Sequence, residues 1–140
     1  MKVIFENDLH RNSEHIFSSI DEKPVASASL AQVHRGRLLN SNKEVAIKLQ
    51  YPFLQVQSKW DLIMLKKLTK VCNYLVKRKN NNEFDFIKLY EEWTSTLIEE
   101  LDFRIEVQHA LKTKELFKHN DRIYIPEYYT DLCSDRLIVM

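Results

Sequence analysis

Glycine and proline are scarce in this sequence, which has one glycine and three prolines among its 140 residues. That scarcity excludes a linker, a collagen-like chain or a low-complexity segment. Cysteine is also rare, and the two cysteines, Cys72 and Cys133, lie far apart. Two thiols in a chain of this size do not predict a disulfide framework, so we interpret both as reduced thiols.

An excess of charge of one sign is absent as well. The 21 basic and 20 acidic residues leave a net charge of +1, which gives no broad electrostatic footprint for nucleic acid or an anionic membrane. No apolar run approaches the roughly 20 residues of a transmembrane helix. The first residues show no targeting signal, although one further upstream would not be visible here. The five histidines lack the spacing of a metal site, so none is predicted.

What the sequence does contain is enough apolar residues, 44%, for one packed domain. Residues 1–15 are expected to be a lead-in, and Glu14–Ile20 reads either as a short helix or as an extended segment. Apolar residues then alternate from Leu30 to Leu39 and from Glu44 to Gln50, with turn formers at 40–42 between the two runs. This pattern predicts a β-hairpin, and Pro52 ends its second strand.

Helical periodicity follows over 56–79 and over 83–118, with a polar turn expected at Lys77–Asn82. The second stretch reads either as one long helix or as two helices with a break. Two β-rich runs come last, at 122–131 and 136–140, and Pro126 suggests an edge or a bulge in the first. The order predicts an α+β fold with helices packed on a small antiparallel sheet.

Lys48 is the first candidate for chemistry, because it ends the strand sequence Val-Ala-Ile-Lys on the same face as the small residue Ala46. Protein kinases place such a lysine near the phosphates of ATP and pair it with a glutamate on a helix. Four residues are weak support alone, since hairpins often carry a surface lysine.

An acidic run supplies the second candidate: Glu99, Glu100, Asp102 and Glu106. On one continuous helix, three of them (Glu99, Asp102 and Glu106) would share a face beside apolar positions. Partly buried carboxylates need partners, and Lys48 is the cation we expect for Glu106. Glu100 and Asp102 would point apart in a regular helix, so either the helix breaks there or they serve different partners. The alternative is a solvated acidic face.

The third candidate is the small-residue loop Ala26, Ser27, Ala28 and Ser29, which precedes the hairpin where a kinase has its glycine-rich phosphate loop. Its backbone N–H groups and hydroxyls could approach phosphates, less freely than glycine would allow. A plain small-residue turn is the alternative interpretation.

These segments together, PVASASLAQVHRGRL, EVAIKLQYP, EELDFRIEVQHA and DRLIVM, resemble the UbiB family of kinase-like proteins, which is linked to ubiquinone biosynthesis. The resemblance runs from about Ile16 to Met140, and the eukaryotic mitochondrial members look nearest. It implies a kinase-like N-terminal lobe with a family-specific helical insertion at 56–79. Lys48 matches the phosphate-contacting lysine, and Glu106 matches its ion-pair partner. The loop 26–29 matches an alanine-rich loop that usually reads A-A-A-S, from which Ser27 departs.

The resemblance also identifies Glu100 and Asp102 as the E-x-D element, although the K-x-G-Q motif that works with this element is absent from the sequence. The catalytic-loop Asp and Asn and the D-F-G motif are absent too. We therefore expect residues 1–140 to be a partial kinase-like domain, with strands leading to the hinge over 122–140. No catalytic residue and no phosphoryl transfer are expected from this segment alone.

The function that the resemblance implies is that of an ATP-binding lobe. It would bind ATP or ADP with Mg²⁺, whose ligands would lie in a missing C-terminal lobe. The parent protein would be an atypical kinase or ATPase that supports ubiquinone biosynthesis or mitochondrial lipid homeostasis. A non-catalytic, pseudokinase-like binding module is the alternative. The expected location is mitochondrial, and the expected partners are the nucleotide and lipid or quinone-precursor machinery, not nucleic acid.

Overall fold

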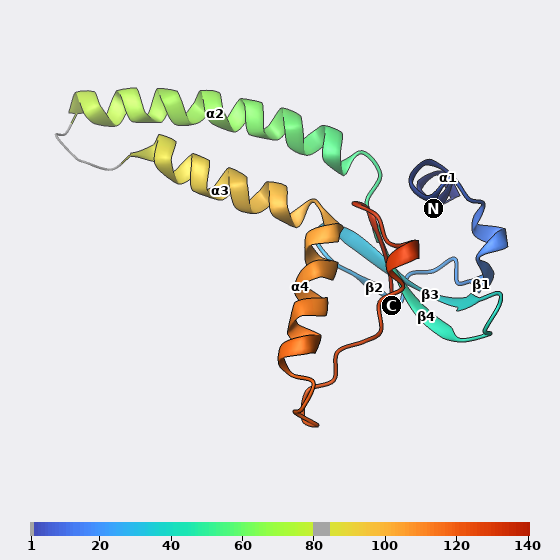
Figure 1. Ribbon diagram of the computed structural model, residues 1–140. Helices are drawn as coiled ribbons and strands as arrows, with labels where there is room; N and C mark the ends of the chain where they lie inside the picture. The colour runs from blue at the N-terminus through green and yellow to red at the C-terminus, as the bar shows by residue number, and fades with distance from the viewer. Residues whose placement is uncertain (1, 80–84) are drawn as a thin grey trace. The chain divides into compact units, whose positions relative to one another are not determined.

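The computed structural model describes residues 2–79 and 85–140, and the chain divides into two compact units (Figure 1). The sheet unit consists of Met1–Tyr51 and Leu101–Met140, and the helical unit consists of Pro52–Glu100. The helical unit is therefore an insertion within the sequence of the sheet unit.

A five-stranded antiparallel sheet forms the centre of the sheet unit. Its strands are β1 (Phe17–Ile20), β2 (Ala26–Ser27), β3 (Ala31–Leu38), β4 (Glu44–Gln50) and β5 (Leu137–Val139). They pair in the order β1-β3-β4-β5, and β2 pairs with the same edge of β3 as β1. The predicted hairpin is confirmed as β3 and β4, and Asn42 in its turn has a left-handed φ of 54°, which asparagine tolerates.

One face of the sheet packs into a core with α1 (Lys2–Leu9). Val45, Ile47 and Leu49 alternate along β4 and point into this core, as the period of two in the sequence predicts. Phe5 of α1 meets Phe17 of β1 edge to face, with ring centroids 5.4 Å apart.

The opposite face of the sheet is covered by α4 (Phe103–Leu116). Phe103 and Val107, one helical turn apart, are both buried against Ala31 and Ile138. Lys48 lies opposite Ile138 in the β4–β5 register, and directly paired residues share a face. The register therefore brings Lys48 to the side of the sheet that α4 covers.

The helical unit consists of α2 (Leu54–Lys79) and α3 (Phe86–Glu100), which pack side by side (Figure 1). The Tyr90 hydroxyl donates to the carbonyl of Leu62 at 3.1 Å, and Asn73 Nδ2 donates to Asp85 Oδ1 at 3.3 Å. Several large apolar side chains remain exposed on the two helices, among them Trp60, Met64, Leu68 and Trp93. None of the helices in the described part of the chain combines the length and the apolar character that crossing a membrane requires.

The second helical stretch breaks in two, since α3 ends at Glu100 and α4 begins at Phe103. The prediction that Glu99, Asp102 and Glu106 share one helical face is therefore wrong. The first stretch continues through Lys79, beyond the start of the turn expected at Lys77–Asn82. Residues 80–84, where the rest of that turn and the start of the 83–118 stretch fall, lie outside the described residues.

The strand predicted over 122–131 is also wrong. Residues 123–129 are irregular and lead into the 3₁₀ turn η2 (Thr130–Leu132). Pro126 cannot donate a ladder hydrogen bond, and Tyr129 N to Val139 O, 2.9 Å, is the backbone contact that links this segment to β5. Residues 14–20, which the sequence predicted either as a short helix or as an extended segment, form the end of the 3₁₀ turn η1 (Ser13–His15) and the strand β1. The helix α1 was not predicted.

Candidate functional site

Lys48 reaches the α4 side of the sheet because the strand alternates. Its neighbours Ile47 and Leu49 point into the α1 core, so its own side chain projects from the other face. The Lys48 side chain is 21% exposed. An ammonium this deeply placed needs a partner, because partial burial weakens its hydration.

Glu106 on α4 is that partner. Phe103 and Val107 turn one face of α4 to the sheet, and Glu106 projects beside them. Lys48 Nζ lies 2.8 Å from Glu106 Oε1 and 2.7 Å from Oε2, so it donates to both carboxylate oxygens. The same ammonium lies 4.6 Å from the centroid of the Phe103 ring, within the range of a cation–π contact.

This ion pair positions more than it stabilises. The Glu106 side chain is 43% exposed, and pairs open to water contribute only about 0–1 kcal/mol. The pair fixes the position of the Lys48 ammonium, which contacts the Glu106 carboxylate on one side and the Phe103 ring on another. Lys48 has three N–H donors and Glu106 engages two of them at most, so at least one is left for an anion.

Tyr128 adds to the electrostatics of this site. Its side chain packs against the cluster that contains Phe103. Burial raises the pKa of the Tyr128 hydroxyl, and the negative charge of Glu106 raises it further. Tyr128 therefore stays protonated at neutral pH and can serve as a hydrogen-bond donor beside the ion pair.

The small-residue loop begins in β2, which pairs with β3, and its first residue, Ala26, faces the same side of the sheet as Lys48. Ala26 pairs with Val33, and Val33 pairs with Lys48, so Ala26 and Lys48 are separated by two strand spacings, roughly 10 Å. Ala28 N donates to Ala31 O at 2.8 Å, which closes the turn from β2 into β3. Residues 26–29 are all exposed, and none has a positive φ, so alanine and serine fit this backbone without glycine.

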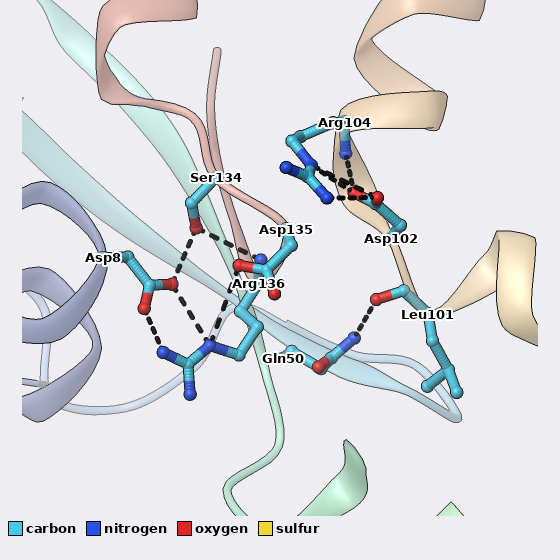
Figure 2. Close-up of polar contacts among 8 residues, drawn as sticks. All are labelled: Asp8, Gln50, Leu101, Asp102, Arg104, Ser134, Asp135 and Arg136. Carbon is cyan, nitrogen blue, oxygen red and sulfur yellow. Dashed lines mark hydrogen bonds and ion pairs between the residues drawn. The ribbon is translucent and has the colours of Figure 1, made fainter.

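The two residues of the E-x-D element have different positions. Glu100 is the last residue of α3 in the helical unit, whereas Asp102 belongs to the sheet unit and caps α4. Asp102 Oδ1 accepts a hydrogen bond from Arg104 N at 3.0 Å, and the carboxylate also binds the Arg104 guanidinium at 2.7 Å (Figure 2). Hydrogen bonding to Arg104 lowers the pKa of Asp102. The break left open by the sequence is therefore real, and Asp102 is the N-cap of the second helix.

Gln50 and Phe103 are site residues that the sequence reasoning missed. Gln50 is 2% exposed, and its Nε2 donates to the carbonyl of Leu101 at 3.0 Å (Figure 2). A polar residue at the end of an alternating apolar strand was the available signal for Gln50. For Phe103, the signal was the apolar pair that it forms with Val107 at a helical interval.

A second polar cluster ties α1 to the turn before β5 (Figure 2). The Asp8 side chain is only 5% exposed and accepts from Ser134 Oγ at 2.8 Å and from Arg136 Nε at 3.2 Å. A second guanidinium nitrogen of Arg136 donates to the other carboxylate oxygen. The hydrogen bond to Asp8 raises the pKa of Arg136. The carbonyl of Arg136 accepts from Gln50 N at 2.9 Å, which joins this cluster to the end of β4.

Comparisons with known proteins match this chain over nearly its whole length and agree on one family. A family model described as "ABC1 atypical kinase-like domain" matches residues 1–140. A protein named "Probable protein kinase UbiB" from Blochmanniella pennsylvanica is 33% identical over 99% of the chain, and one from Tolumonas auensis is 31% identical over 96%. A Shewanella protein of that name is 33% identical over 96%. The chain spans about a quarter of the length of these relatives, 25% of the first and 24% of the other two.

Proposed function

The chain belongs to the ABC1 atypical kinase-like family, and on this premise we propose that its sheet unit binds the phosphates of ATP or ADP. The sheet unit is the kinase-like N-terminal lobe of that domain, and the helical unit is inserted between the strand that carries Lys48 and the helix that carries Glu106. The relatives carry the name "Probable protein kinase UbiB", and ATP is the phosphoryl donor of protein kinases.

The observation that carries the proposal is the held ammonium of Lys48. A phosphate-binding lysine must present its charge at a fixed point, because catalysis of phosphoryl transfer consists mainly of positioning and charge stabilisation. Glu106 holds Lys48 through both carboxylate oxygens, and the face of Phe103 supports the ammonium. The remaining N–H of Lys48 would donate to a phosphate oxygen.

The loop of residues 26–29 fits a role as the cover of the phosphates. The loop is exposed, has small side chains and is separated from β4 by the strand β3. The hydroxyl groups of Ser27 and Ser29 are available as donors. Ala28 N is committed to Ala31 O, so the two hydroxyl groups are the donors that we assign to an anion in this loop. Lys48 and this loop would together hold the nucleotide, while Glu106 would keep Lys48 in place.

Bound ATP with Mg²⁺ would supply the transferable phosphoryl group and the metal charge. We assign no Mg²⁺ ligand to the described residues, and propose that a second lobe provides the metal ligands. For the whole protein, we propose a kinase or ATPase activity that supports ubiquinone biosynthesis or mitochondrial lipid homeostasis. A mitochondrial location is part of this proposal, and fluorescence microscopy of the tagged full-length protein tests it.

Substitution of Lys48 tests nucleotide binding. In the full-length protein, Lys48→Ala is expected to weaken ATP binding about tenfold or more, since a charge-assisted hydrogen bond contributes about 1.5–3 kcal/mol. Isothermal titration calorimetry with MgATP measures the change. Lys43→Ala is the matched control, because Lys43 lies in the same hairpin region with a side chain 63% exposed.

Unchanged ATP affinity in Lys48→Ala would remove Lys48 from its proposed role. Parallel measurement of phosphate release separates two further outcomes. ATP turnover supports the enzyme, whereas ATP binding without turnover supports a pseudokinase-like binding module.

A further inference from the structure

Gln50 makes a contact that neither the kinase signature nor the ion pair explains. It is the last residue of β4 and follows Lys48 by two positions, so both side chains project from the same face of the sheet. Gln50 Nε2 donates to the carbonyl of Leu101 at 3.0 Å. Leu101 is the first residue of the sheet unit after the helical insertion, and Tyr51 is the last one before it. Gln50 therefore joins the two ends between which the whole helical unit is inserted.

The contact fixes the start of α4. Asp102, the next residue, caps the helix, and Phe103 N donates to Asp135 O at 3.0 Å. Gln50 N in turn donates to the carbonyl of Arg136 at 2.9 Å. The first turn of α4 is thus held from β4 on one side and from the turn before β5 on the other. Glu106 follows within little more than one helical turn.

Stability alone does not account for an amide at this position. Gln50 Oε1 is buried and has no hydrogen-bond partner among the described residues, and a buried unpaired acceptor destabilises the folded protein. The single Nε2 hydrogen bond to Leu101 offsets this penalty only in part. The net gain is small or negative, so the distinctive result of the amide is the geometry it imposes on Leu101.

We propose that Gln50 is a positioning residue, which sets α4 against β4 so that Glu106 meets the ammonium of Lys48. Without the Gln50–Leu101 hydrogen bond, the carbonyl of Leu101 loses its partner and the start of α4 shifts or frays. Glu106 then holds Lys48 less tightly. The consequence for nucleotide binding rests on the proposed function, whereas the positioning of the ion pair does not.

The reactivity of Lys48 measures this positioning without any nucleotide. Nζ of Lys48 is held against both carboxylate oxygens of Glu106 and the face of the Phe103 ring, so the ion pair shields it from an acylating reagent and slows acylation of Lys48. In the full-length protein, peptide mass spectrometry after brief acetylation is expected to show Lys48 labelled several-fold faster in Gln50→Met than in the unsubstituted protein. Glu106→Gln should show a similar increase, and the double variant should show no further increase, because both changes act on the same contact.

Two controls separate positioning from general loosening. Gln57→Met places the same substitution at an exposed glutamine of α2 and should leave Lys48 labelling unchanged. Lys43, in the same protein, should label at a constant rate in every variant. Gln50→Asn, whose shorter amide cannot span the same distance, repeats the test if Gln50→Met does not fold.

Unchanged labelling of Lys48 in both Gln50 variants would overturn the inference, and so would a uniform increase at all lysines. An effect in the double variant equal to the sum of the two single effects would also overturn it. If the full-length protein binds no ATP, the proposed function fails while this result still decides the role of Gln50. If the full-length protein binds ATP, Gln50→Met introduced alone should weaken ATP binding. Added to Glu106→Gln, the same substitution should cause no further loss of ATP affinity.

Discussion

At the scale of single residues, Asp102 combines two interactions at the start of α4. Its carboxylate caps the helix through Arg104 N and also binds the Arg104 guanidinium. The hydrogen bond to the Arg104 side chain is the main reason that the pKa of Asp102 is lowered, and the backbone hydrogen bond adds to the effect. A lowered folded-state pKa means that the charged carboxylate stabilises the folded protein.

Asp102 therefore predicts a pH dependence of stability. Its contribution is fully present above the unfolded-state pKa of about 3.9 and is lost as the pH falls through the lower folded-state pKa. Asp102→Ala should cost about 1 kcal/mol at pH 7, the usual effect of losing an N-cap. Asp102→Asn, which keeps the capping oxygen but not the charge, should cost less, and its deficit should narrow below about pH 4.

Urea unfolding of the two variants and the unsubstituted protein, from pH 7 to pH 3, measures these differences. A deficit of Asp102→Asn that stays constant across this range would show that the charge of Asp102 does not contribute.

Sequence patterns predicted Lys48 and Glu106 as a pair, and the structure brings them together. Lys48 lay in a clear strand alternation, and the family resemblance identified Glu106. Gln50 and Tyr128 could not be predicted in the same way, because their contacts with Leu101 and with the Phe103 cluster join segments distant in sequence. Asp102 as a cap was available from the sequence, since aspartate before an apolar helical run is a typical N-cap.

At the scale of elements, β3 depends on its single glycine. A Cβ at Gly36 would lie 2.5 Å from Ile47 Cδ1 and 3.5 Å from Phe17 Cδ1. Ile47 is completely buried, so its side chain has little room to move away. The only glycine in the sequence therefore permits close packing of β3, β4 and β1 on the α1 side of the sheet.

Gly36→Ala is accordingly expected to destabilise the protein by about 1–3 kcal/mol, the usual cost of overpacking a core. Ile47→Val removes the Cδ1 atom that clashes most. The cost of Gly36→Ala should therefore be smaller in the Ile47→Val background, as measured by denaturant unfolding of the four proteins in this cycle. Equal costs in both backgrounds would contradict the packing explanation.

The elements differed in how well they could be predicted. The hairpin of β3 and β4 has strict alternation and a turn rich in asparagine and serine, and it formed where expected. The run at 122–131 has β-forming residues but contains Pro126, and it has no neighbouring strand to pair with along most of its length. Strand propensity without a partner strand did not give a strand. The helix α1 carried too weak a periodic pattern to be predicted.

At the scale of the whole molecule, the proposed nucleotide site belongs entirely to the sheet unit. Lys48 and Glu106 lie 58 positions apart in the sequence, and the helical unit occupies the sequence between them. The kinase-like lobe is thus assembled from two separate segments, and the polar contacts of Gln50 and Arg136 connect them. Because of this separation, the residues alone left a solvated acidic face as the alternative for Glu106, and the family resemblance added the assignment of Glu106 as the partner of Lys48.

The most direct test of this account is a crystal structure of the full-length protein with a non-hydrolysable ATP analogue and Mg²⁺. We expect Lys48 Nζ within hydrogen-bonding distance of a phosphate oxygen while Glu106 still contacts the same nitrogen, with residues 26–29 over the phosphates. A nucleotide bound elsewhere, or Lys48 separated from Glu106 in the nucleotide complex, would contradict the central claim.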